Sequence, residues 1–203
     1  ICGFYENQKG QILLDGIDIK QIKKADLRKN IGMVLQDVFL FSGDIETNIR
    51  LFDRSIPKKA IIEAAENANA NYFIEELGMK YRHPVTEKGF TLSMGQRQLL
   101  SFARALVIDP KILVMDEATS SIDTETEILI QEALVKLMEG RTTIAIAHRL
   151  STIQSADKII VIHKGEVREM GTHSQLLENR GLYYNLHMLQ YKDVEEALNK
   201  GPA

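Results

Sequence analysis

Short apolar runs alternate with amphipathic segments through the second half of the chain. Three runs, KILVMD (111–116), TTIAIAH (142–148) and KIIVIH (158–163), have the length and β-branched content of buried strands. Amphipathic stretches from about Thr124 to Met138 and from about Ser151 to Ala156 separate them and predict helices. Because the strands are almost wholly apolar and alternate with helices, the pattern predicts an α/β core with a parallel sheet covered on both faces.

The first third of the chain predicts two strands followed by a helical insertion. QILLDG (11–16) is a strand that ends in an Asp15-Gly16 turn, and IGMVLQ (31–36) is a second strand. From about Asp44 to Leu77 apolar residues recur at three and four spacing among good helix formers. This stretch is therefore expected to be helical.

Three further segments complete the predicted organisation. TLSMGQRQLLSFARAL (91–106) begins like a loop and continues as a helix with one apolar face. Lys164-Gly165 predicts the turn of an edge hairpin. The tail from His173 to Lys200 is expected to form two helices broken at Gly181.

Composition excludes several classes of protein and of binding site. The 203 residues are 44% hydrophobic with a net charge of -3, which suits one globular domain and gives no basis for a nucleic-acid partner. Cys2 is the only cysteine, which excludes an intramolecular disulfide and a cysteine-rich zinc site. No apolar run reaches the roughly 20 residues of a membrane-spanning helix, so the chain as given is expected to be soluble. It begins at Ile1 in mid-pattern, and we interpret it as the remainder of a longer polypeptide.

Polar side chains stand at the ends of three apolar runs. Asp116 and Glu117 end the first, at the sheet edge where doubly wound folds bind ligands. One carboxylate there can hold Mg²⁺ through water, while its neighbour orients or deprotonates an attacking water. His148 could hydrogen-bond a terminal phosphate or that water, and the Gln36 amide could reach either Mg²⁺ or the water. Each of these residues alone also fits an ordinary strand end.

The segment around Ser93 has two interpretations of equal weight. A short loop with Ser93 and Gly95 that leads into a helix presents backbone N–H groups and the positive end of the helix dipole to an anion such as phosphate. The same residues also form an ordinary capping box, in which Ser93 is the N-cap and Gln96 stands three positions later.

Together these motifs resemble the nucleotide-binding domain of ABC transporters over essentially the whole chain. Gln36 is similar to the Q-loop glutamine, LSMGQ (92–96) to the signature motif, and ILVMDE (112–117) to the Walker B strand with its catalytic glutamate. SSID (120–123) is similar to the D-loop, and His148 to the switch histidine. The resemblance implies an α/β fold with a RecA-like P-loop NTPase core, a mostly parallel sheet and an α-helical signature subdomain.

The resemblance also implies a domain organisation. One ABC ATP-binding domain, truncated at its N-terminus, would span residues 1–203. Its core would comprise about 1–36 and 107–175, its helical subdomain about 37–106, and its C-terminal helices about 173–200.

ATP and Mg²⁺ are the implied cofactors, with ATP held between two such domains arranged head to tail. The implied catalytic residues are Glu117 as general base, His148 on the γ-phosphate, and Gln36. Asp116 and Gln36 would hold the metal. The residues implied to contact nucleotide, across the interface between subunits, are Ser93, Gly95, Gln96 and Asp123.

Finer features resemble the exporter branch, and bacterial multidrug or lipid exporters in particular. VFLFSGDIETNI (38–49) is similar to the exporter segment that receives the coupling helix of the membrane domain. PVTEKG (84–89) is similar to the exporter loop before the signature, although Thr86 stands where many members have glycine. The implied partners are a second ABC ATP-binding domain, identical or different, and transmembrane coupling helices. The implied location is the cytoplasmic face of a cell membrane.

The sequence departs from the family at several points. No G-x-x-x-x-G-K-[ST] loop occurs in it, and we expect that loop upstream of Ile1. Met94 and Ile122 replace the commoner glycine and leucine of the signature and the D-loop. Two alternatives therefore stay open: a non-catalytic fragment or pseudo-ATPase, and a DNA-repair-type ABC ATPase. The long coiled coils of that second class would need sustained heptads, which are absent from the sequence.

Overall fold

The computed structural model describes residues 1–89, 91–116, 124–146 and 153–189. The chain divides into two compact units, residues 1–146 and residues 147–203. Glu117, Asp123 and His148 lie outside the described residues, as does part of the helix predicted at 151–156.

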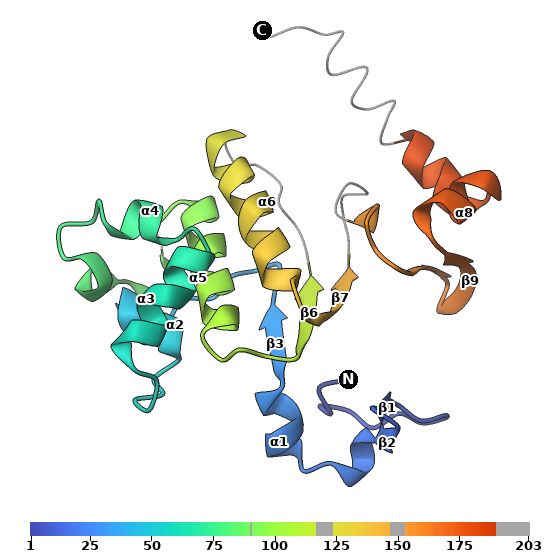
Figure 1. The fold of residues 1–203 in the computed structure, drawn as a ribbon, viewed down its shortest axis with the longest axis horizontal. Helices are drawn as coiled ribbons and strands as arrows, with labels where there is room; N and C mark the ends of the chain where they lie inside the picture. Colours follow the sequence, from blue (N-terminus) through green and yellow to red (C-terminus); the bar gives the residue numbers. More distant parts are fainter. Residues whose placement is uncertain (90, 117–123, 147–152, 190–203) are drawn as a thin grey trace, which may run out of the picture. The chain divides into compact units, whose positions relative to one another are not determined.

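A parallel sheet of three strands organises the first unit. β6 (Ile112–Asp116) lies between β3 (Ile31–Val34) and β7 (Thr142–Ile146), and both pairings are parallel. Val34 is opposite Met115, and Asp116 is opposite Ile146. The carboxyl ends of all three strands therefore meet at one edge of the sheet (Figure 1). This arrangement confirms the predicted α/β fold class.

A small hairpin and a helix precede the sheet. β1 (Leu13–Leu14) pairs antiparallel with β2 (Ile17–Asp18) around the predicted Asp15-Gly16 turn. Both turn residues have positive φ angles, 48° and 83°, as a tight two-residue hairpin turn requires. A 3-10 turn, η1 (Ile19–Gln21), and α1 (Lys24–Lys29) then lead into β3.

The predicted helical insertion forms, but as several short helices. Its elements are β4 (Gly43–Asp44), α2 (Ile45–Arg50), α3 (Lys58–Asn67), α4 (Asn71–Ile74), η2 (Lys80–Arg82), β5 (Pro84–Val85) and η3 (Glu87–Gly89). The long helical pattern is broken at Asn69, whose φ of 54° is left-handed, a conformation that asparagine tolerates better than most residues. The Asn69 amide donates to the backbone oxygen of Leu129 and to the Glu132 carboxylate, which ties this break to α6 (Thr124–Met138).

One apolar core joins the helical insertion to the sheet. α5 (Met94–Leu106) packs against β3, α2, α3 and α6, and its apolar face is buried. A single buried cluster contains Phe73 of α4, Phe102 of α5, and Leu113 and Met115 of β6. Figure 1 shows α5 and α6 together on one side of the strands. The helical insertion therefore has no separate core of its own.

On the opposite face of the sheet, the first unit has a small apolar cluster. Leu27 of α1 packs there with Ile31 and Ile112, near the amino ends of the strands. Toward the carboxyl ends, Ile144 and Ile146 are 38% and 56% exposed.

The second unit contains the predicted hairpin and the predicted helix break. β8 (Ile159–His163) pairs antiparallel with β9 (Glu166–Gly171) through the Lys164-Gly165 turn. α8 (His173–Glu178) ends just before Arg180, which has a left-handed φ of 50°, and residues 182–189 form the next helix. The Glu169 carboxylate accepts hydrogen bonds from the backbone amides of Leu182 and Tyr183, and so caps that helix.

The close approach of β3 to the start of β6 predicts a steric requirement for Gly32. A Cβ atom added at Gly32 would lie 2.7 Å from Pro110 Cγ and 3.4 Å from Leu113 Cδ1. Gly32→Ala should therefore lower the free energy of unfolding by about 1–3 kcal/mol, as overpacking does. Urea unfolding followed by circular dichroism measures this change.

Gly78→Ala is the matched control, because nothing lies within 4 Å of a Cβ at this exposed glycine. It should change the free energy of unfolding by less than about 0.5 kcal/mol. Equal effects of the two substitutions would contradict the close contact at Gly32.

Candidate functional site

Two of the predicted site residues stand at the carboxyl edge of the parallel sheet, one at the end of a strand and one shortly after the adjacent strand. Asp116 is the last residue of the central strand β6, and Gln36 follows the end of β3 by two residues. Neighbouring strands lie about 4.8 Å apart, so the residues that leave them at one edge are close in space. Asp116 is half-buried and Gln36 is exposed, so both can be reached by a ligand at this edge.

Three predicted catalytic and interface residues lie outside the described residues, and their roles stay predictions. Glu117 directly follows Asp116, and His148 follows the end of β7 by two residues. Asp123 directly precedes α6. The strands and helix that lead to these residues are formed as the sequence predicts.

α5 begins with a closed capping box. Ser93 Oγ accepts a hydrogen bond from the backbone N–H of Gln96 at 3.1 Å, and Gln96 Oε1 accepts one from the backbone N–H of Ser93 at 3.0 Å. The interpretation of these residues as a helix cap is therefore confirmed.

The same helix start can also attract an anion. A helix leaves the amides of its first turn without intrahelical acceptors, and the capping box uses those of Ser93 and Gln96 but not those of Met94 and Gly95. Accepting a bond at Ser93 Oγ does not use that hydroxyl's own hydrogen. Met94 is 47% exposed, whereas Gly95 is buried. Capping and phosphate binding are thus compatible at this helix start.

The donor atoms at the sheet edge fit a hard divalent cation. No group of three or more His, Cys, Asp or Glu side chains arranged to hold a metal occurs within the described parts of the chain. Mg²⁺, however, is commonly bound by one or two carboxylates, with waters and substrate phosphates as its other ligands. Asp116 and Gln36 carry a carboxylate and an amide oxygen and follow adjacent strands of the sheet, and these are donor types that fit that mode of binding.

Sequence reasoning missed a partly buried polar network that holds the segment shortly after Gln36 in the chain. Arg104 of α5 and Asn48 of α2 hydrogen-bond each other and hold backbone groups of Phe39 and Phe41, shortly after Gln36 in the chain. Burial lowers the pKa of the Arg104 guanidinium. One feature of the sequence could have indicated this network: Arg104 is a charged residue between Ala103 and Ala105, in a helix with apolar neighbouring positions.

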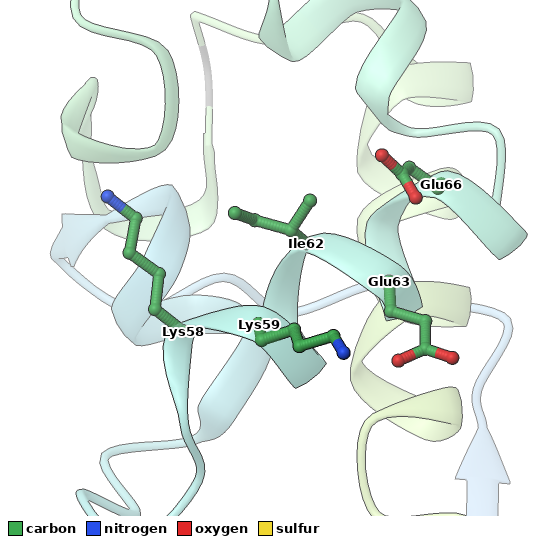
Figure 2. Close-up of a pocket in the computed structure, with 5 residues that line it drawn as sticks. All are labelled: Lys58, Lys59, Ile62, Glu63 and Glu66. Carbon is green, nitrogen blue, oxygen red and sulfur yellow. The ribbon is translucent and has the colours of Figure 1, made fainter.

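A pocket along α3 lies apart from the predicted site residues. Figure 2 shows its lining, in which two lysines and two glutamates surround one isoleucine: Lys58, Lys59, Ile62, Glu63 and Glu66. All five side chains come from one helix, and their charges are mixed. This pocket contributes nothing to the candidate site.

Comparison with solved structures finds the same fold. A bacterial Atm1-family ABC exporter, whose structure contains bound ATP, matches with a TM-score of 0.85 and 40% identity. The match covers 93% of this chain and 33% of that chain. Among the described helices of the present chain, none has both the length and the apolar content to cross a membrane.

Sequence comparisons find exporter proteins among the relatives. An ATP-dependent lipid A-core flippase of Syntrophus aciditrophicus is 50% identical over 94% of this chain and 32% of its own length. A probable multidrug resistance ABC transporter ATP-binding/permease protein of Bacillus subtilis is 49% identical over 92% of this chain and 28% of its own length. The chain thus spans about a third of the length of such relatives. A family model described as ABC transporter matches residues 1–120, more than half of the chain, and the chain therefore belongs to the ABC transporter family.

Proposed function

We propose that this chain is the ATP-hydrolysing part of a longer ABC exporter. One observation supports the proposal. Asp116 ends β6 directly before Glu117, and Gln36 follows the adjacent parallel strand β3 at the same edge of the sheet. Relatives named for multidrug resistance, lipid A-core flipping and exotoxin translocation support the export direction. The substrate itself is not specified by these residues.

Glu117 is proposed as the general base on the attacking water. Asp116 and Gln36 would hold Mg²⁺, which neutralises charge on the transferred phosphoryl group when it is bound. His148 would hydrogen-bond the γ-phosphate. This division of roles explains why two adjacent carboxylates are needed, since one carries the cation and the other takes the proton.

The start of α5 is proposed to bind ATP held by a second ABC ATP-binding domain. Ser93, Gly95 and Gln96 would contact the γ-phosphate, and Asp123 would lie across the same interface. The favourable interaction is that of an anion with helix amides and the positive end of the helix dipole. ATP would then hold the two domains together, and hydrolysis would release them.

The segment after Gln36 is proposed to receive the coupling helix of a membrane domain. Phe39, Phe41 and Phe52 form edge-to-face contacts with ring centroids 5.0 Å and 5.6 Å apart. All three aromatic side chains are exposed, and exposed apolar clusters of this kind mark interaction sites. A relative that is named as both ATP-binding protein and permease supports a membrane partner of this type.

The chain alone should neither bind ATP tightly nor hydrolyse it. The G-x-x-x-x-G-K-[ST] loop, whose backbone and lysine grip the phosphates in such ATPases, does not occur in the 203 residues. Phosphate release by the purified chain, compared with its Glu117→Gln variant, measures this. Sustained hydrolysis above that control would contradict the expectation.

In the full-length transporter, Glu117→Gln should lower ATP turnover at least about a hundredfold, as removal of a general base does. Because the amide still leaves the nucleotide contacts in place, ATP-bound dimers should accumulate. Steady-state phosphate release and size-exclusion chromatography with ATP measure the two effects. Turnover at the unsubstituted rate would remove Glu117 from the base role.

Ser93→Asp separates capping from phosphate binding at α5. Aspartate caps helices about as well as serine, so stability should be retained, but its charge would repel a phosphate at the same place. ATP-dependent dimerisation of the full-length transporter should therefore weaken at least about tenfold, the effect of roughly 1.4 kcal/mol. Thermal unfolding and sedimentation with and without ATP measure both properties.

Thr172→Asp is the matched control, because Thr172 and Gln175 form the same capping box at the start of α8. This variant should keep both stability and ATP-dependent dimerisation. Equal loss of dimerisation in the two variants would refute a specific phosphate contact at Ser93.

A further inference from the structure

We propose that Arg104 and Asn48 are positioning residues that hold Gln36 in place for ATP hydrolysis by anchoring the segment after it to α5 and α2. The proposal rests on the proposed ATPase function and adds two residues that the motif comparison does not assign. It concerns a pair that contacts neither nucleotide nor metal and acts through Gln36.

The Asn48 side chain acts as a backbone partner for Phe41. Asn48 is only 1% exposed, and its Oδ1 accepts a hydrogen bond from the Phe41 backbone N–H at 2.9 Å. Its Nδ2 donates to the Phe41 carbonyl at 2.9 Å and to the Asp44 carbonyl at 3.0 Å. Both backbone groups of Phe41 are therefore fixed by one buried side chain.

Arg104 extends this anchor to α5. Its Nη1 donates to the Phe39 carbonyl at 2.9 Å, its Nε to the Asn48 carbonyl at 3.1 Å, and its Nη2 to Asn48 Oδ1 at 3.2 Å. The guanidinium carbon lies 5.9 Å from the centre of the Phe41 ring. The acceptors in this network are neutral, so they offset the desolvation of the cation less well than a carboxylate would. The fixed fork of the guanidinium thus sets the direction of the Phe39 and Asn48 carbonyls.

The anchor lies close to Gln36 along the chain. β3 ends at buried Val34, and Leu40 is fully buried between the two anchored carbonyls. Residues 35–38 thus bridge a strand and a helical core, with Gln36 exposed in the middle. If the anchored end of residues 35–38 becomes mobile, the side-chain amide of Gln36 samples more positions. Displacements of about 1 Å at a catalytic group lower turnover strongly.

The chain offers a matched control in Arg141. This arginine also holds backbone carbonyls, with Nε donating to Pro110 at 3.1 Å and Nη1 donating to Leu137 at 3.1 Å, and it pairs with Asp109. It directly precedes β7 and so lies at the amino edge of the sheet, opposite the edge of Gln36 and Asp116. Arg141→Lys therefore disturbs the same kind of contact far from the site.

A double-mutant cycle in the full-length transporter tests the proposal, using Arg104→Lys, Gln36→Ala and the double variant. Arg104→Lys should lower kcat for ATP about tenfold and change KM less than about twofold, because the pair acts on positioning and not on binding. In the Gln36→Ala background the same substitution should change kcat by less than about twofold, since the group it positions is gone. Hydrogen exchange of the peptide containing residues 37–41 should become faster in Arg104→Lys.

Arg141→Lys should lower thermal stability, leave kcat within about twofold of the unsubstituted value and leave the 37–41 peptide protected. An unchanged kcat in Arg104→Lys, or a loss of the same factor with and without Gln36, would overturn the proposal. An absence of ATP hydrolysis in the full-length transporter, or full turnover in Glu117→Gln, would instead overturn the proposed function.

If Arg104→Lys does not fold, Asn48→Asp replaces it in the cycle. Aspartate keeps the acceptor for Phe41 and Arg104 but loses the two donated bonds. Failure of both variants to fold would assign the pair a purely structural role and would contradict the proposal.

Discussion

The parallel pairing of β3, β6 and β7 is the constraint on which the rest of the first unit depends. Parallel ladders align the carboxyl ends of their strands, and the register places Val34, Met115, Asp116 and Ile146 within one residue of a common edge. A shift of one residue in β6 would turn Leu113 and Met115 out of the core and move Asp116 to the other face. Burial of the apolar residues in this strand therefore also fixes the position of its terminal carboxylate.

The sheet edge and α5 pack on the same apolar core, so a displacement of one is transmitted to the other. Phe102 of α5, Phe73 of α4 and Met115 of β6 belong to the same buried cluster. Close-packed interiors transmit small displacements because there is little free space to absorb them. The Arg104–Asn48 network adds directional bonds to this apolar contact, and the two together hold the segment after Gln36 from the helical side while β3 holds it from the sheet side.

The two candidate binding elements have opposite electrostatic preferences. The edge that carries Asp116 attracts a cation, whereas the start of α5 presents amides and a positive dipole end that attract an anion. A magnesium–nucleotide complex has both kinds of charge, so it suits a site assembled from both elements. The capping box at Ser93 does not compete with this role, because it uses one lone pair of the hydroxyl and not its hydrogen.

The sequence by itself determined the α/β class, the strands β3, β6, β7 and β8, the hairpin turns at Asp15 and Lys164, and the capped start of α5. These follow from local periodicity, turn chemistry and cap residues, which depend on neighbours in the chain. The positions of Asp116 at the end of β6 and of Gln36 shortly after β3 could also be predicted, because they follow once the strands are known. Only the tertiary structure decided the break at Asn69 and the hydrogen bonding of Arg104 to Asn48. Each of these depends on contacts between residues far apart in the sequence, for which periodicity carries no signal.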